Sequence, residues 1–374
     1  MKEAAPTRRL PFAFFSKSLI FCLLLGKLNN TSTPSDSKKR GLCIMKSVLT
    51  GTEMGKLWAT YIGNTMGKCM LSYYLKHIDD PEIKVALEYA LDLSTTNIET
   101  IEVFFKEADF PIPIGFTDRD VDLNAPRLYI DEFYLHYLRY ASKAGMSLYT
   151  IAVPLVTRRD IRDFFIKCVE ETMKLQSLVA VISESKNELM NAPVIQPPER
   201  VDFVHSKKFL GSFINEGRPL QGLEIAHIFG NLNNDITSKA LIIGFAQVAN
   251  DKKVRTFLER GKNINQKHIE LLTEKLSQDG LPSPTLKDHF VTSSTVSPFS
   301  DKLMVFHKLD MFNVKIREYA NGISLNGRKD IGALFVRCQA EVMLYVEDGA
   351  SLMIENAWLE KPPEAVDRSK FINK

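Results

Sequence analysis

Glutamate and histidine residues in the second half of the chain have the types, and part of the spacing, of ligands of a two-metal centre. Helical di-iron and di-manganese proteins take one Glu from each of two helices and a Glu-x-x-His motif from each of the other two. Carboxylate and imidazole ligands suit these metals and leave positions open for dioxygen. One such motif occurs, from Glu224 to His227. The candidate metal ligands are Glu224, His227, His268, His307 and Glu341.

This ligand set is incomplete, and its members do not fall at one depth of a helical bundle. Asn265 stands where a carboxylate should precede His268 by three residues. At 1.5 Å per residue, His227 falls roughly 34 Å and His268 roughly 24 Å from the turn that joins the first two helices of this half. His307 and Glu341 fall at about 12 Å and about 15 Å. We therefore expect His307 and Glu341 to lie level with each other and His227 to lie far from both.

The first half of the chain carries different residues at the corresponding positions. They are Glu53, Lys56, Asn97, Tyr137 and Glu171. This set cannot hold two metal ions, and Lys56 more simply pairs with Glu53 three residues earlier on one helix. The sequence therefore predicts no bound cofactor, with iron or manganese in the second half as the alternative.

The cysteines offer little further chemistry. The chain has five, an odd number, without a CxxC or another metal-binding spacing. Cys168 and Cys338 each follow a basic residue, but adjacent residues on a helix point apart, so we expect both thiols to be buried in the core. Gly-rich phosphate loops and the Gly-x-Ser-x-Gly motif are absent. This cysteine usage is typical of a reducing cytoplasm.

An internal repeat is the strongest organising feature of the chain. A shift of 171 residues aligns Glu53 with Glu224, and a shift of 170 aligns the Arg158–Ile161 segment with Arg328–Ile331. Apolar positions and prolines also match in order over more than one hundred residues. Each copy closes with Pro-Pro-Glu. The chain is therefore expected to contain the same folded unit twice.

Helical periodicity runs through both copies, and no stretch alternates like a half-buried strand. The predicted helices are 52–77, 81–108, 128–155 and 158–189 in the first copy, and 223–249, 252–278, 299–323 and 328–356 in the second. Long Pro- and Gly-containing segments, 109–127 and 280–298, separate the second and third helices of each copy. Short, long and short connections predict a ferritin-like bundle with one crossover. The fold class is therefore all-α, with two tandem four-helix bundles.

Domain boundaries follow from this pattern. We expect the first bundle at 45–194, a Pro- and Gly-punctuated linker at 195–222, and the second bundle at 223–374. Residues 1–44 are interpreted as a leader outside the folded protein, upstream of a start at Met45. Their basic and then apolar order is also similar to a signal peptide. The expected location is therefore the cytoplasm, with export as the alternative.

Composition narrows the classes of partner. The chain has 48 basic and 45 acidic residues, a net charge of +3, and no basic tract. The electrostatic footprint of a nucleic-acid binder is therefore absent. The apolar run from Leu19 to Leu25 is far shorter than the ~20 residues of a membrane span. We expect neither nucleic acid nor a membrane span, and a protein partner or self-association instead.

Several segments resemble a known family. Gly115–Val121 and Leu123–Leu128 look like the crossover signature of the domain-of-unknown-function family DUF3231, found mainly in spore-forming Bacillus-type bacteria. Similar to its other signatures are Gly244–Ala249, Phe299–Met304 and Trp358–Pro363. The resemblance covers about residues 50–370. It implies tandem ferritin-like bundles in a bacterial cytoplasmic protein, and it implies no activity.

The sequence favours a non-enzymatic helical module that binds a protein partner, a second copy of itself, or a small ligand between its helices. The reason is that a bundle scaffold occurs twice while the metal ligands are incomplete in both copies. The alternative is a ferritin-like di-metal oxidase or metal-binding protein, with its site in the second bundle.

Overall fold

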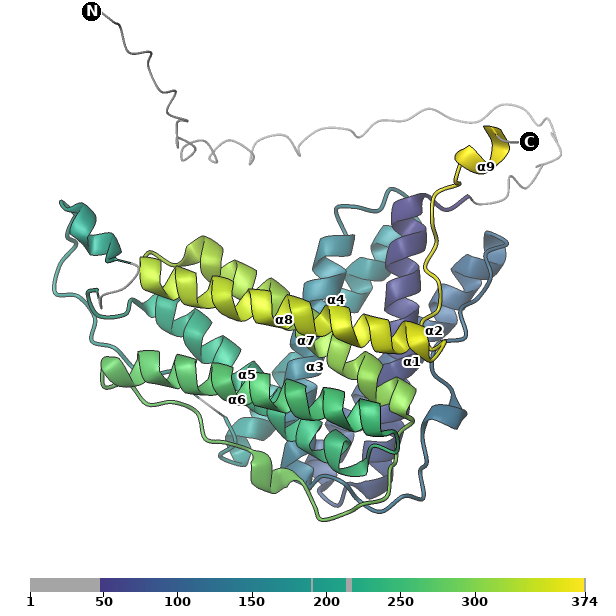
Figure 1. Cartoon of the computed structure of the whole chain (residues 1–374), viewed down its shortest axis with the longest axis horizontal. Coiled ribbons are helices and arrows are strands. Elements are labelled where there is room, and N and C mark those ends of the chain that lie inside the picture. Colours follow the sequence, from purple (N-terminus) through teal and green to yellow (C-terminus); the bar gives the residue numbers. More distant parts are fainter. Residues whose placement is uncertain (1–47, 190, 213–216, 373–374) are drawn as a thin grey trace, which may run out of the picture. The chain divides into compact units, whose positions relative to one another are not determined.

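The computed structural model describes residues 48–189, 191–212 and 217–372. Long helices make up both halves of this part of the chain (Figure 1). The first half contains α1 (Gly51–His77), α2 (Pro81–Glu107), η1 (Asp118–Asp120), α3 (Asp131–Ala152) and α4 (Arg159–Ser185). The second contains α5 (Gly222–Val248), α6 (Lys252–Gln278), η3 (Asp288–Phe290), α7 (Asp301–Leu325) and α8 (Lys329–Glu355). The short η2 (Lys207–Leu210) lies between the halves, and α9 (Ser369–Ile372) follows them.

The all-α fold class and the two repeated four-helix bundles are confirmed. Within the described residues the only β pairing is two isolated bridges. The starts of α1 and α5 are 171 residues apart, and the starts of α3 and α7 are 170 apart. The long connection between the second and third helices is present in each half, as the prolines predicted. No helix in this part of the chain is long and apolar enough to cross a membrane.

Aspartate side chains cap the starts of α2 and α6. Asp80 accepts hydrogen bonds from the backbone N–H groups of Glu82 and Ile83 at the start of α2. Asp251 does the same for Lys253 and Val254 at the start of α6. These carboxylates satisfy N–H groups that the first turn of a helix leaves without partners.

The two crossovers pair with each other, which the sequence did not predict. Antiparallel bridges join Val121 to Phe299 and Tyr129 to Val291. At a shift of 170, residue 121 corresponds to 291 and residue 129 to 299. Each bridge therefore joins one of these two positions in one half to the equivalent of the other position in the second half. The two halves are therefore related by a pseudo-two-fold axis. Extended backbone around Tyr129 also explains why α3 begins at Asp131 rather than at the predicted residue 128.

Helices α3 and α7 meet along this axis. The Tyr137 hydroxyl and His307 Nε2 share a hydrogen bond of 2.8 Å, and Arg317 Nη2 donates to Ser147 Oγ at 3.3 Å. Each pair again joins equivalent positions, and the second pair lies ten residues beyond the first. Since the contacts keep the same register, α3 and α7 run in the same direction along the axis. The buried side chains of both halves form one continuous hydrophobic cluster.

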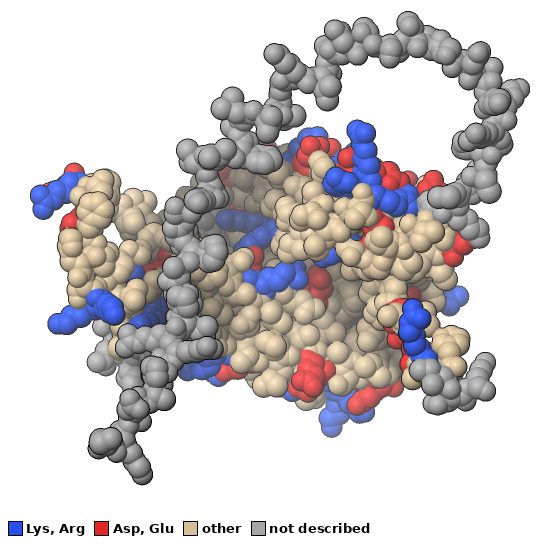
Figure 2. All heavy atoms as spheres, turned by 90° about the horizontal axis from the view of Figure 1, so that it is seen from above, with Lys and Arg blue, Asp and Glu red and all other residues tan. Residues whose placement is uncertain are grey.

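The surface has no large patch of one charge on the face shown in Figure 2, where basic and acidic side chains lie close to one another. Several ion pairs on the molecule join the two signs directly, such as Arg260 with Asp348 at 2.7 Å and Lys143 with Glu318 at 2.9 Å. The Lys143–Glu318 pair also links α3 to α7 across the axis.

Gly244 on α5 is a test of the packing between the halves. The Tyr129 hydroxyl donates to the Leu241 carbonyl at 2.7 Å, and this places the Tyr129 ring where a Cβ of residue 244 would lie. Gly244→Ala should therefore lower the free energy of unfolding by about 1–3 kcal/mol in urea titrations, the cost of overpacking. The control is Gly63→Ala, where an added Cβ meets nothing within 4 Å and helix propensity favours alanine. Equal stability of the two variants would contradict this packing.

Candidate functional site

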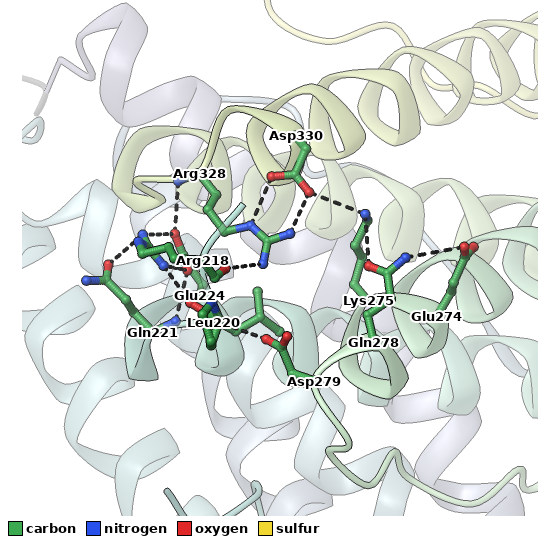
Figure 3. Close-up of polar contacts among 11 residues, drawn as sticks. Arg218, Leu220, Gln221, Glu224, Glu274, Lys275, Gln278, Asp279, Arg328 and Asp330 are labelled. Atoms are coloured by element: carbon green, nitrogen blue, oxygen red, sulfur yellow. Dashed lines mark hydrogen bonds and ion pairs between the residues drawn. The ribbon is translucent and has the colours of Figure 1, made fainter. Parts of the chain in front are cut away.

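Glu224, the first predicted metal ligand, ties the start of α5 to the rest of its bundle (Figure 3). Its carboxylate accepts two hydrogen bonds from Arg218 at 2.9 Å and one each from the backbone N–H groups of Gln221 and Arg328 at 2.9 Å. Burial raises its pKa, but these donors outweigh burial and hold the pKa below its usual value. Its lone pairs are therefore occupied by protein donors.

Glu53 has the same role at the start of α1. It accepts from the backbone N–H groups of Thr50 at 2.8 Å, Thr157 at 3.1 Å and Arg158 at 2.8 Å. Burial opposes ionisation, yet the hydrogen bonds from Arg158 and Thr50 dominate and lower the pKa of Glu53 to about 2. The two glutamates thus occupy equivalent positions of the repeat for a structural reason. In each bundle, the glutamate links the first helix to the turn before the fourth helix by hydrogen bonds.

His227 lies apart from His268, His307 and Glu341. It is half-buried, and its Nδ1 lies 3.4 Å from Asn326 Oδ1. At 1.5 Å per residue it is about 12 Å along α5 from Asp235, near the centre of the bundle. This position agrees with the predicted separation of His227 from His307 and Glu341.

His268 and Glu341 do come together. His268 is fully buried, and its Nε2 lies 3.3 Å from Glu341 Oε2, while its Nδ1 lies 2.9 Å from the Tyr319 hydroxyl. Burial, with the nearby Lys315 ammonium as a second cause, lowers the pKa of His268 to about 2, so the ring is neutral. The sequence estimate paired Glu341 with His307 instead, and that pairing is not what the structure has. His307 lies on the face of α7 that contacts α3, where it meets Tyr137.

The residues that the structure gathers do not match the donor set of a two-metal centre. Among the described residues, no three His, Cys, Asp or Glu side chains lie where they could hold one metal ion. One neutral imidazole and one carboxylate meet, and two lysines stand deeper in the same bundle. The five-residue site with iron or manganese stays a prediction, and no chemistry is derived from it.

A buried ion pair occupies the centre of the second bundle. Lys315 Nζ lies 2.6 Å from Asp235 Oδ1, and both side chains are at most 1% exposed. Lys315 also donates to Asn265 Oδ1 at 2.6 Å, and the Tyr319 hydroxyl donates to Asp235 Oδ2 at 3.1 Å. Burial raises the pKa of Asp235, against the attraction of Lys315. The sequence did not predict this pair, because Asp235 has the polar residues Asn231, Ser238 and Lys239 around it on its own helix.

A second lysine extends this polar cluster. Lys308 Nζ is fully buried and donates to Ser238 Oγ at 2.8 Å and to the Ser238 carbonyl at 3.1 Å. Burial lowers the pKa of Lys308 well below its usual value, and the neighbouring Lys315 charge acts in the same direction. The central polar cluster of the second bundle comprises Asp235, Ser238, Asn265, His268, Lys308, Lys315, Tyr319 and Glu341.

The first bundle has uncharged residues where the second has Asp235, Lys308 and Lys315, although Glu341 has Glu171 as its equivalent. In the order of the repeat, Asp235, Ser238, Asn265, His268, Lys308 and Lys315 correspond to Asn64, Gly67, Ser94, Asn97, Leu138 and Gly145. Uncharged hydrogen bonds remain. Asn97 donates to Asn64 Oδ1 at 3.3 Å, and Asn64 donates to the Tyr149 hydroxyl at 3.3 Å. Cys168 is buried beside Asn97 as expected, and burial raises its pKa to about 12, so it is an unreactive thiol.

A cavity of about 260 Å³ opens where these side chains are smaller. It reaches from the centre of the first bundle, at Ser94 and Thr172, to α7 of the second half. Gly67 and Gly145 line it where the second bundle has Ser238 and Lys315. The equivalent hollow beside the second bundle, of about 210 Å³, is lined by residues of the interface between the halves and by none of the central polar cluster.

Four polar side chains that line this cavity lack full hydrogen bonding. Asp310 has neither a hydrogen bond nor an ion pair within the described chain, and burial raises its pKa although Arg317 opposes this. The buried Nε of Arg317 has no partner among the described residues. The hydroxyl of Thr60, a residue that is 1% exposed, has none either. Buried polar atoms without partners are costly, and Thr60 Oγ1, Arg317 Nε and also His307 Nδ1 are such atoms on residues that line the cavity, beside the half-buried Asp310. These groups are the sign of a ligand site.

Comparison with known proteins gives a family and no activity. A family model described as a protein of unknown function (DUF3231) matches residues 38–201 and again residues 208–371. Among solved structures, the chain is similar to a protein from Bacillus halodurans C-125 described as a "putative spore coat protein". That match has 15% identity and a TM-score of 0.38, and it covers 40% of this chain and 98% of the other. No curated protein matches the chain.

Acid should remove the contribution of Glu53 to stability. Its pKa is about 2 in the folded protein and 4.5 in an ordinary environment. The stabilisation is therefore complete above about pH 4.5 and is lost as the pH falls towards 2. Glu53→Gln should lower the melting temperature at pH 7, and the difference from the wild type should shrink over that range. A difference that stays constant from pH 7 to pH 2 would contradict the assignment.

Removal of one partner from the buried pair should be costly. Asp235→Asn leaves the Lys315 ammonium buried without its counter-ion, which typically costs about 3–5 kcal/mol in free energy of unfolding. Asp235→Asn combined with Lys315→Met should be more stable than Asp235→Asn alone, because no charge is left buried. As a control, Asp348→Asn removes an exposed ion pair of the same bundle and should cost under about 1 kcal/mol. Urea titration measures all three, and a double variant no more stable than Asp235→Asn alone would argue against the coupling.

Proposed function

The chain belongs to the DUF3231 family of proteins of unknown function, in two tandem copies, and on this premise we propose that it is a non-enzymatic module that binds a small molecule in the cavity of its first bundle. The observation that carries the proposal is the difference between the two bundle centres. Lys308 and Lys315 fill one of them, while Leu138 and Gly145 leave room in the other.

The size of the cavity supports an organic ligand rather than a few waters. An engineered apolar cavity of about 150 Å³ in another protein binds benzene, and this cavity measures about 260 Å³. Aromatic and aliphatic side chains make up much of its wall, including Trp58, Leu148, Tyr149 and Phe306. An apolar wall with a few convergent polar groups is the usual character of a small-molecule site.

The environment of the titratable groups favours binding over catalysis. The thiols of Cys168 and Cys338 are buried, and burial raises the pKa of each to about 12, so neither is a nucleophile. Burial lowers the pKa of His307 to about 3, and the His307 ring shares a hydrogen bond with the Tyr137 hydroxyl. A base that is never protonated near neutral pH is poorly matched to acid–base catalysis.

A small ligand is also favoured over a second copy of the chain. The contact that one bundle could offer another, through the crossovers and through α3, is already made between the two halves. A protein partner is left as the other class of binding that the sequence suggests, and no particular surface of the described residues singles it out.

A side chain that fills the cavity should weaken the binding of a small apolar molecule. Gly63 lines the cavity and an added Cβ there meets nothing within 4 Å, so Gly63→Met places an apolar side chain in the space. Titration of benzyl alcohol, followed by calorimetry and melting temperature, should give saturable binding to the wild type that weakens about tenfold or more in this variant, a loss of at least about 1.4 kcal/mol.

The matched control is Gly55→Met. Gly55 is an exposed glycine of the same helix, also with nothing within 4 Å of an added Cβ, and it does not line the cavity. This variant should bind benzyl alcohol as the wild type does. Equal affinity of the wild type and Gly63→Met for benzyl alcohol would overturn the proposed function.

A further inference from the structure

One stripe of α7 carries an acidic and a basic residue of the cavity wall. Phe306, Asp310, Val314 and Arg317 all line it, at spacings of four, four and three residues. Such spacing puts side chains on one face of a helix, one above another. An acidic group and a basic group therefore face the same space with an apolar residue between them.

Asp310 and Arg317 do not neutralise each other. The described chain has no ion pair between them within 4.0 Å, although Arg317 is the one charged group that opposes the burial of Asp310. Arg317 donates through Nη2 to Ser147 and keeps its Nε free of protein partners. Both side chains line the cavity, and neither uses all of its hydrogen-bonding capacity within the described chain.

The second bundle shows what such a site accepts. There an ammonium group, Lys315 Nζ, lies 2.6 Å from a buried carboxylate and 4.5 Å from the centre of the Phe312 ring. The combination of a carboxylate and an aromatic face is a recognised environment for an organic cation. In the first bundle the equivalent of this lysine is Gly145, and Asp310 lies near the aromatic residues Tyr137, Tyr140 and Tyr149.

From these observations we propose that the ligand is an apolar α-amino acid bound as the zwitterion, with its ammonium group at Asp310, its carboxylate at Arg317 and its side chain against the apolar wall. This proposal rests on the proposed function and names its ligand class. An amine alone would leave Arg317 without an anion, and an acid alone would leave Asp310 without a cation. A zwitterion supplies both partners across the gap at Val314.

Four probes separate the contributions of the two charges. L-phenylalanine carries both groups, phenethylamine only the ammonium, 3-phenylpropionate only the carboxylate, and benzyl alcohol neither. Calorimetric titration of the full chain should give L-phenylalanine at least about tenfold tighter binding than either singly charged probe, since it makes a charge-assisted hydrogen bond that each of those probes lacks.

Two variants assign each charge to its residue. Asp310→Asn should weaken L-phenylalanine and phenethylamine about tenfold and leave 3-phenylpropionate no weaker than before. Arg317→Met keeps the apolar stem and should weaken L-phenylalanine and 3-phenylpropionate by a similar factor while sparing phenethylamine. Glu318→Gln is the control on the same helix, because Glu318 pairs with Lys143 and does not line the cavity. It should leave all four affinities unchanged.

The outcomes distinguish this inference from the proposed function. If benzyl alcohol binds and Gly63→Met removes that binding, but L-phenylalanine binds no tighter than its two analogues, the zwitterion is wrong and the ligand site stands. The same conclusion holds if Asp310→Asn and Arg317→Met weaken all probes equally. If none of the four probes binds the wild type, both proposals are overturned.

Discussion

The pairing of the two crossovers is the constraint on which the rest of the molecule depends. Each crossover runs the length of a bundle as irregular backbone, and its buried N–H and C=O groups need partners. The other crossover supplies them: Ile130 N–H donates to the Phe290 carbonyl at 3.0 Å, and Ser300 N–H donates to the Asp120 carbonyl at 3.0 Å. Neither bundle can provide these bonds alone. Because α3 and α7 begin directly after the paired residues, the pairing also brings the two helices together.

The two bundle centres meet one requirement in opposite ways. A polar position in the middle of a helical bundle must be neutralised, hydrogen-bonded or opened to water or a ligand. The second bundle neutralises it with the Asp235–Lys315 ion pair. Burying these two charges costs desolvation free energy, and the pair holds both side chains in a rigid arrangement. The first bundle replaces the charges with Asn64 and Gly145 and keeps space instead. One scaffold therefore contains a filled centre and an open one, and the difference lies in a few side chains.

Much of the fold could be predicted from the sequence because its signals are local. The helical periodicity and the N-caps at Asp80 and Asp251 depend on residues close together in the chain, and the repeat is visible because the same local pattern occurs twice. The pairing of the crossovers could not be predicted, since Val121 and Phe299 carry no mark of being neighbours. Depth along a helix also failed for His307, because rise per residue gives height and not the direction in which a side chain points. Glu224 and Glu53 have the residue type of metal ligands, yet backbone N–H groups use their lone pairs.

The meeting of Tyr137 and His307 on the pseudo-two-fold axis has a consequence for how the molecule can vary. In a dimer of identical subunits, a residue on the axis meets its own copy, so a hydroxyl there faces a hydroxyl and a ring faces a ring. Joining the halves in one chain removes that restriction and lets each member of a pair change alone. Asp310 and Arg317 have Tyr140 and Ser147 as their equivalents, so an assembly of two first halves would have neither charge beside its cavities. Covalent linkage thus lets α7 of the second half place two charged side chains beside the cavity of the first half, an arrangement that a symmetric pair could not have on one side alone.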